Sequence, residues 1–218
     1  MKKAFILSLA LLALTPAMAQ KRAFTIEDIY RLQYATSPAV SKDGRLAYTI
    51  SKSDLKNQRS TSNIIVDGKP ITADGKSFSP MWSQRNQDLY LCSYASGTTQ
   101  LYLWKGGKME QITDYPLGVD GATVSPDGRY IAFAAEVFPD LGGADGKANK
   151  ERIDNMAHNT LQAHIADSLL YRHWTTYTDG KFWHIIIYDT VKKTYTDVTP
   201  GSFHSPVFSP SGPSGFVF

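Results

Sequence analysis

Short runs of aromatic and β-branched residues alternate along the chain with turns rich in Ser, Pro, Asp and Gly. The clearest unit begins at Ser125-Pro126-Asp127-Gly128 and continues into the apolar run 130–135. Proline and aspartate favour the corner positions of a tight turn, and glycine takes the position that needs a positive φ. Aromatic and β-branched residues then favour an extended backbone. The unit therefore predicts a turn that leads into a strand.

This unit recurs along the chain at a regular interval. In chain order, the first copy begins at Ser41-Lys42-Asp43-Gly44, a looser second copy begins at Ser83, the unit at Ser125 is the third, and a fourth begins at Ser209-Pro210-Ser211-Gly212. The serines at 41, 83 and 125 are spaced by 42 residues, a length typical of one four-stranded propeller blade. We therefore predict an all-β fold, a partial β-propeller of about three to four four-stranded blades over residues 20–218.

A second signal precedes most of these copies by four residues. It is a Ser-Pro pair, found at Ser37-Pro38, Ser79-Pro80 and Ser205-Pro206. Outer hairpins follow the first two copies, because strand-like runs flank the turns Asp67-Gly68 and Gly106-Gly107. The repeated order of these signals supports a modular sheet protein rather than a single continuous sheet.

The third copy is interrupted before its outer hairpin. Its first strand ends near Glu136, and the hairpin restarts only after Asp179-Gly180, with strand-like runs at 182–189 and 193–199. A glycine-rich turn at 142–146 opens the intervening segment. Apolar residues then recur at intervals of four, at Ile153, Ala157, Leu161, Ile165 and Leu169. We therefore predict a helical insertion at about 139–175, with a helix over about 149–171 or two helices broken near Asn159.

The N-terminus carries the pattern of a secretory signal. Lys2 and Lys3 precede an apolar run from Ala4 to Leu14, and Ala17-Met18-Ala19 fits the small-residue cleavage rule. We predict a signal peptide at 1–19 and a periplasmic or secreted protein without a stable membrane anchor. The alternative is an uncleaved anchor, for which the apolar run is short. After it, Thr25 and Asp28 have the spacing of a capping box, which predicts a short helix over 24–32.

Charge and cysteine content narrow the function classes. The formal net charge is +3, and removal of Lys2 and Lys3 leaves 21 basic against 20 acidic residues. Such a balance gives no reason to expect nucleic acid as a partner. Cys92 is the single cysteine, so the chain forms no internal disulfide. We interpret it as a small buried residue of a strand rather than as a reactive thiol.

Two pairs in the insertion have a spacing that can bind metal. Asp154 and His158 lie at i,i+4, and His164 and Asp167 lie at i,i+3 of the predicted helix. Neither pair has a third ligand, so we interpret both as pairs on a solvated helix surface. We expect no metal and no cofactor.

The combined motifs resemble the propeller domain of the prolyl oligopeptidase family of serine peptidases. The resemblance rests on the signal, the Thr-Ile-Glu-Asp helix, the Ser-Pro-Asp-Gly repeats and, above all, Leu169-Leu170-Tyr171-Arg172-His173-Trp174 followed by Asp179-Gly180-Lys181 and His184. It is closest to the dipeptidyl-peptidase 5 and acylaminoacyl-peptidase branch and covers essentially the whole mature chain. The repeats are shared with TolB-like propellers, whereas the Arg-His-Trp exit from the insertion is more discriminating.

The resemblance implies an exopeptidase in which the propeller restricts the access of short peptides to a C-terminal α/β-hydrolase domain. The nucleophile of that domain requires a Gly-x-Ser-x-Gly turn. No such string occurs in these 218 residues, and Gly212-Pro213-Ser214-Gly215 does not have its spacing. We therefore expect the chain to be a non-catalytic part of a longer protein, with that hydrolase domain and short peptides as partners. The peptide specificity, the number of blades and the choice between monomer and homodimer stay open.

Four residues are candidates for contact with substrate. Arg172, His173 and Trp174 would face the substrate if the insertion projects between the domains, and they would otherwise pack the insertion onto the blade. In the related dipeptidyl peptidase IV branch, paired glutamates from a propeller extension hold the amino group of the substrate. The resemblance places Glu136 at the start of the analogous extension, where it stands alone.

A second function class is compatible with the repeats. A self-sufficient periplasmic propeller of the TolB type would bind protein partners on one face. The inserted segment with its Arg-His-Trp exit favours the peptidase hypothesis, because a simple repeat propeller does not need one.

Overall fold

The computed structural model describes residues 22–160, 163–166, 169, 171–173, 175–206 and 215–218. The chain divides into two compact units, one that ends at Leu32 and one that spans Gln33–Phe218. In the first unit, helix α2 covers Ile26–Ile29. The predicted capping box is confirmed, because Thr25 and Asp28 hydrogen-bond reciprocally. The helix is shorter than predicted, and the signal peptide predicted at 1–19 lies outside the described residues.

The second unit is built on the predicted turns. At the third copy, the backbone N–H of Gly128 donates to the Ser125 carbonyl at 2.8 Å, and Gly128 has φ +75°. The Ser125 hydroxyl donates to Asp127 at 2.7 Å and accepts the backbone N–H of Tyr130 at 2.9 Å. The first copy repeats these contacts, with Gly44 at φ +87°. Each turn therefore satisfies its own polar groups and fixes where the next strand begins.

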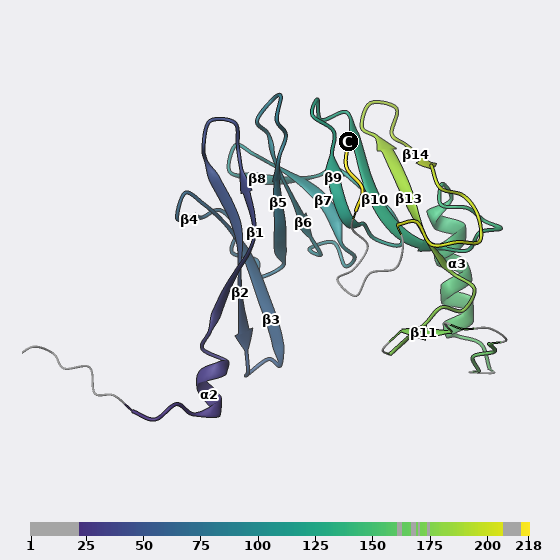
Figure 1. Cartoon of the computed structure of the whole chain (residues 1–218), viewed down its shortest axis with the longest axis horizontal. Coiled ribbons are helices and arrows are strands. Elements are labelled where there is room, and N and C mark those ends of the chain that lie inside the picture. The colour runs from purple at the N-terminus through teal and green to yellow at the C-terminus, as the bar shows by residue number, and fades with distance from the viewer. Residues whose placement is uncertain (1–21, 161–162, 167–168, 170, 174, 207–214) are drawn as a thin grey trace, which may run out of the picture. The chain divides into compact units, whose positions relative to one another are not determined.

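Three four-stranded antiparallel sheets follow one another along the chain, as Figure 1 shows. The first contains β1 Gln33–Val40, β2 Leu46–Asp54, β3 Arg59–Val66 and β4 Lys69–Pro70. The second contains β5 Ser77–Trp82, β6 Leu89–Ser93, β7 Gln100–Lys105 and β8 Lys108–Gln111. The third contains β9 Asp120–Val124, β10 Tyr130–Val137, β13 Phe182–Asp189 and β14 Thr194–Asp197. The prediction of antiparallel, blade-like sheets is confirmed.

Two of the three Ser-Pro pairs, Ser37-Pro38 and Ser79-Pro80, mark a bulge in the first strand of a sheet, whereas Ser205-Pro206 lies outside any strand. Ser37 has φ 51° and Ser79 has φ 48°, and the pairing register shifts at both positions. Such bulges bend a strand and increase its twist. The bulge of the second sheet also contacts the first sheet, because the backbone N–H of Ser79 donates to the Thr49 hydroxyl at 3.0 Å. In the third sheet Gly121, with φ 56°, lies at the equivalent register shift.

Hydrophobic clusters fill the spaces between neighbouring sheets. The largest lies between the second and third sheets and includes Leu101, Phe133, Ile186 and Cys92, all buried. Two smaller clusters join the first and second sheets, around Trp82 and around Leu91. Full burial of a side chain of this size contributes about 1.5–3 kcal/mol. The core is therefore modular, with one cluster or more at each junction, and Cys92 is the buried strand residue that we predicted.

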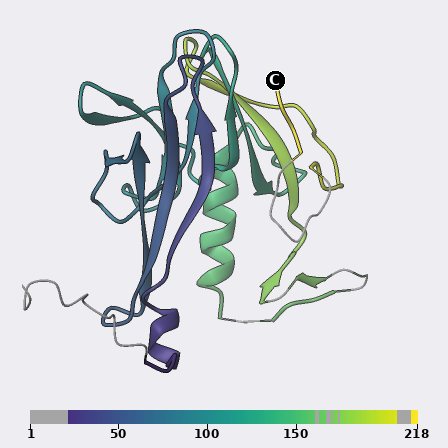
Figure 2. The same cartoon turned by 60° about the vertical axis from the view of Figure 1, so that its left-hand side comes forward.

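The third sheet is interrupted along the chain between β10 and β13. Strand β10 nevertheless pairs with β13 along its whole length, from Tyr130 opposite Asp189 to Val137 opposite Phe182. The interruption contains helix α3, Gly146–Ala157, and a small hairpin of β11 Arg172–His173 and β12 Thr176–Tyr177. Figure 2 shows α3 running down to this hairpin. None of the described residues within the insertion beyond Ala157 is helical.

The predicted helix over 149–171 was therefore wrong in its extent. Leu161 lies outside the described residues, and Ile165 and Leu169 are 91% and 86% exposed, so that no core exists there for an apolar stripe to pack against. Helix α3 is instead held at its start by Asn149, which is fully buried. Its side chain accepts the Phe138 backbone N–H at 2.7 Å and donates to the carbonyls of Gly142 and Asp145 at 2.7 and 2.9 Å.

Most of the fourth copy, including Ser209-Pro210-Ser211-Gly212, lies outside the described residues. Residues 216–218, which follow it, are not in a strand. Within the described part of the chain, no helix has the length and apolar character needed to cross a bilayer.

Candidate functional site

The sequence-predicted site residues lie on two elements. Glu136 is the penultimate residue of β10 and pairs with Trp183 of β13. Arg172 and His173 form β11 and pair with Tyr177 and Thr176 of β12. Trp174 lies outside the described residues, and of His173 only the backbone is described. The end of β10 and the inserted hairpin are thus the two elements that carry the candidates.

An ion pair joins Glu136 to Lys181, the residue that immediately precedes β13. Lys181 Nζ lies 3.1 Å from Glu136 Oε2, and the two side chains retain 16% and 25% of their exposure respectively. The full-length pairing of β10 with β13 brings the two residues together across the insertion. Glu136 is therefore not a free edge charge, because a partly buried cation neutralises it.

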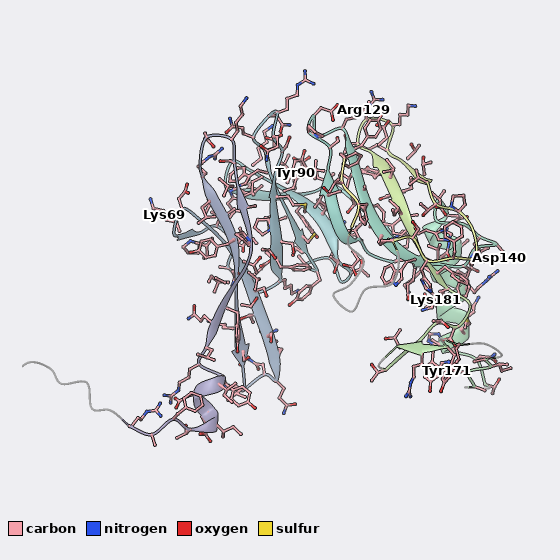
Figure 3. All side chains as sticks on the ribbon, in the orientation of Figure 1. Lys69, Tyr90, Arg129, Asp140, Tyr171 and Lys181 are labelled. Carbon is pink, nitrogen blue, oxygen red and sulfur yellow. The ribbon has the colours of Figure 1, made fainter. Side chains whose placement is uncertain are left out.

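These residues line a cavity of about 590 Å³ between the third sheet and the insertion. The sheet contributes Glu136, Trp183 and Phe182, and the insertion contributes Arg172, Tyr171 and Tyr177. Figure 3 labels two of the lining residues, Lys181 beside α3 and Tyr171 farther along the insertion. The structure thus brings Glu136 and Arg172, predicted independently, to the wall of one cavity.

A stacked group of side chains forms the insertion wall. The rings of His164 and Tyr177 are parallel within 3°, with centroids 3.6 Å apart. His164 Nδ1 lies 2.7 Å from Asp179 Oδ1, and the Arg172 guanidinium lies 5.9 Å from the centre of the Tyr177 ring. The cation and the ring quadrupole attract each other at this range. The stack fixes the small hairpin although no hydrophobic core lies beneath it.

The Asp154 carboxylate does not pair with the His158 imidazole, the first of the two pairs predicted in the insertion. His164 lies outside any helix and contacts Asp179, and Asp167 lies outside the described residues. The Asp154 carboxylate pairs with Lys150, whose Nζ lies 2.5 Å from Oδ1 and 2.6 Å from Oδ2, while His158 Nδ1 lies 2.6 Å from the Asp154 backbone carbonyl. No cluster of three metal-ligating side chains occurs among the described residues.

A second histidine closes the sheet side of the cavity. His204 Nδ1 accepts the backbone N–H of Trp183 at 3.2 Å, and its ring lies 5.1 Å from that of Phe182. Burial lowers the pKa of His204, and the nearby charge of Glu136 opposes that effect. His204 is consequently neutral at pH 7, with its remaining proton on Nε2 because Nδ1 accepts a hydrogen bond.

The cavity is lined by two carboxylates, Glu136 and Asp179, together with two cations, two imidazoles and several aromatic rings. None of its lining residues is a serine or a cysteine that could act as a nucleophile, within the part of the chain that the structure describes. Such a site can bind a polar molecule with both charges and an apolar body. Sequence reasoning missed Lys181, Asp179 and His204. The Asp179-Gly180 turn was the available signal for the first two, because it fixes where β13 starts.

Comparisons with known proteins agree with this architecture. No family model matches the chain. Over 206 residues it is 28% identical to the uncharacterized peptidase YuxL of Bacillus subtilis, a match that covers 88% of this chain and 30% of that protein. In fold it is similar to acylaminoacyl peptidase of Pyrococcus horikoshii, with a TM-score of 0.60 and 12% identity, over 82% of this chain and 26% of that one.

A weaker likeness is to TolB of Acinetobacter baumannii, with a TM-score of 0.43 and 16% identity, over 75% of this chain and 32% of that one. The chain therefore spans less than a third of the length of each of these proteins. The sequence match is to a peptidase, and the structural match to acylaminoacyl peptidase shows a shared propeller-type fold.

Proposed function

We propose that the chain is the propeller part of an exported serine exopeptidase. In this role it restricts the access of peptides to an α/β-hydrolase domain of the same polypeptide, and it contributes binding groups rather than catalytic ones. The signal pattern at 1–19 supports export. The 28% identity with a peptidase along almost the whole chain supports the enzyme class.

The observation that carries this proposal is the cavity beside Glu136. It lies where β10 passes into the insertion, and it holds a carboxylate together with the cations Lys181 and Arg172. A short peptide has a positively charged amino end, a polar backbone and an apolar or aromatic body. Charge-assisted hydrogen bonds are the strong contacts for such groups, so the cavity matches an end of a peptide better than it matches a uniformly charged or a fully apolar ligand.

We assign Glu136 to the amino group of the peptide. Its present partner is Lys181, so a bound ammonium would share the carboxylate with a lysine that is 16% exposed. Lys181 and Arg172 would then lie beside the peptide carbonyls. We propose that His173 and Trp174, the two residues that follow Arg172 in the sequence, extend the contact surface.

Hydrolysis requires groups that this sequence does not contain, since no Gly-x-Ser-x-Gly turn is present. We therefore expect purified residues 20–218 to release no chromophore from dipeptide p-nitroanilides. Measurable release that copurifies with the chain would contradict the proposal.

A polypeptide that also contains the hydrolase domain provides the positive test. Glu136→Gln should raise KM for peptides with a free amino end by about tenfold and leave kcat nearly unchanged, because it removes binding but no catalytic group. Glu110→Gln, at an exposed position of the outer strand β8, is the matched control. An unchanged KM for the first variant would refute the role of Glu136. A stable protein partner in place of peptide binding would favour the TolB-type alternative.

A further inference from the structure

A second cavity of about 580 Å³ lies between the second and third sheets and shares Glu136, Lys181 and Trp183 with the first. Its wall is mostly apolar and aromatic. The apolar and aromatic lining residues are Phe78, Tyr94, Leu117, Val119, Ile153 and Trp183. Four elements with different roles meet here: β5, the segment that precedes β9, helix α3 and β13. The cavity is therefore formed by the packing of two sheets against the insertion, and its wall does not come from a single loop.

One carboxylate in this cavity has no countercharge. Asp120, the first residue of β9, lines the cavity, and among the described residues it forms no ion pair. A hydrogen bond with the Gly121 backbone favours its charged form. Asp120 is an exposed residue of β9, but its carboxyl is partly desolvated within the cavity, and this desolvation acts more strongly and raises its pKa. The contrast with Glu136, which has Lys181 at 3.1 Å, is direct: two carboxylates line the same space and only one is neutralised.

We propose that this second cavity is a subsite for a basic side chain of the peptide, with Asp120 as the group that binds its cation. The proposal rests on the function proposed above and extends it to a substrate class, peptides that carry lysine or arginine near the end held at Glu136. An alkyl stem fits the apolar wall, and an ammonium or guanidinium head meets both a carboxylate and aromatic faces. Binding of the cation would favour the ionised form of Asp120 and so oppose the effect of its partial desolvation.

Other ligand classes fit less well. An acidic side chain would meet two carboxylates and gain only Lys181, which is already paired. A divalent metal ion would find no cluster of three ligating side chains among the described residues. A purely apolar side chain would displace water from the Asp120 carboxylate without replacing its hydrogen bonds. A basic side chain is the class that can both pack its alkyl stem against the apolar wall and pair its charge with Asp120.

The test compares peptides that differ only at one side chain. Dissociation constants of fluorescently labelled Ala-Lys-Ala and Ala-norleucine-Ala, with free amino ends and the label at the carboxyl end, are measured for residues 20–218. We expect the lysine peptide to bind about tenfold more tightly, a factor that corresponds to one charge-assisted contact. In Asp120→Asn the preference should disappear, while Asp120→Glu should keep part of it. Asp114→Asn, an exposed aspartate outside the cavity, should behave like the wild type.

The outcomes separate the two proposals. Equal affinity of the wild type for both peptides, or a lysine preference that survives Asp120→Asn, would overturn the subsite while leaving the peptide-binding function in place. Failure of both peptides to bind would contradict the proposed function and the subsite together. The wild-type comparison needs no substitution, so the inference stays testable even if a variant at Asp120 does not fold.

Discussion

The fully buried imidazole of His184 lies with Nδ1 2.6 Å from Oδ2 of Asp197. The same carboxylate oxygen accepts the backbone N–H of Gly143 at 2.7 Å, and His184 Nε2 lies 2.8 Å from the carbonyl of Gly201. A Cβ on Gly143 would lie 2.1 Å from the Ile186 side chain, which explains why glycine occupies the turn here. One buried pair therefore joins β13, β14 and the start of the insertion beneath the cavity that contains Glu136.

Asp197→Asn should destabilise the fold. The substitution removes the charge that accepts bonds from His184 and Gly143, and it weakens the contact with the Thr199 backbone N–H at 3.0 Å. Buried hydrogen bonds to a charged group contribute about 1.5–3 kcal/mol each, so we expect a loss of about 3 kcal/mol in the free energy of unfolding. Urea denaturation measures it. Asp140→Asn, which removes an exposed partner of Arg152, should change the midpoint little; equal losses for both variants would contradict this.

Asn149→Ala should loosen the insertion. It removes three buried hydrogen bonds and leaves the Phe138 backbone N–H without its acceptor. We expect the free energy of unfolding to fall by about 2–4 kcal/mol, with faster amide hydrogen exchange in residues 138–157. Asn155→Ala, at an exposed position of the same helix, is the matched control and should be nearly neutral. Equal amide exchange rates over residues 138–157 in the two variants would show that Asn149 does not hold the helix.

Cys92 should be inert in the folded protein. Burial, reinforced by the charge of Asp120, raises the pKa of its thiol to about 12. At pH 8 only about one thiol in ten thousand would be ionised, and the thiolate is the reactive form. Iodoacetamide should therefore label Cys92 only after denaturation, as mass spectrometry would detect. Labelling of the native protein at the rate of a free cysteine would show that this strand is open.

The folded state should become less stable in mild acid because His204 is harder to protonate when folded than when unfolded. Its folded pKa is lowered, so the unfolded state binds more protons between the two values. The stability is complete above the unfolded value of about 6.5 and falls as the pH decreases through it. Glu136→Gln should deepen this loss, because the Glu136 charge raises the pKa of His204. Melting temperatures from pH 7.5 to 5 test this, with His204→Gln as the variant in which the slope should be reduced.

Local chemistry made much of the fold predictable. The serine turns at 41 and 125 contain all of their hydrogen-bonding groups within a few residues, and so do the glycine hairpins. The repeat also predicted the pairing of β10 with β13. The third copy lacks an outer hairpin directly after its first strand, and the next hairpin-like pattern in the sequence begins after Asp179-Gly180. The Ser-Pro pairs were visible, but their role as bulges depends on the partner strand.

The errors and omissions have a common cause. An apolar spacing of four predicts a helix only where a surface exists to bury it, and Ile165 and Leu169 meet none. Glu136 was identified at the start of the insertion, but Lys181 became its partner only through the register of two strands 45 residues apart. The sequence did not single out Asp120. What distinguishes this residue is that it has no ion-pair partner among the described residues of a cavity formed by elements distant in the sequence.

The central claim is that the cavity beside Glu136 holds the amino end of a peptide. Isothermal titration of residues 20–218 with trialanine and with N-acetyl-trialanine tests it most directly. We predict that the free form binds at least about tenfold more tightly and that Glu136→Gln, unlike Glu110→Gln, removes the difference. Equal affinities of the wild type for the two peptides, or a difference that persists in Glu136→Gln, would contradict the account.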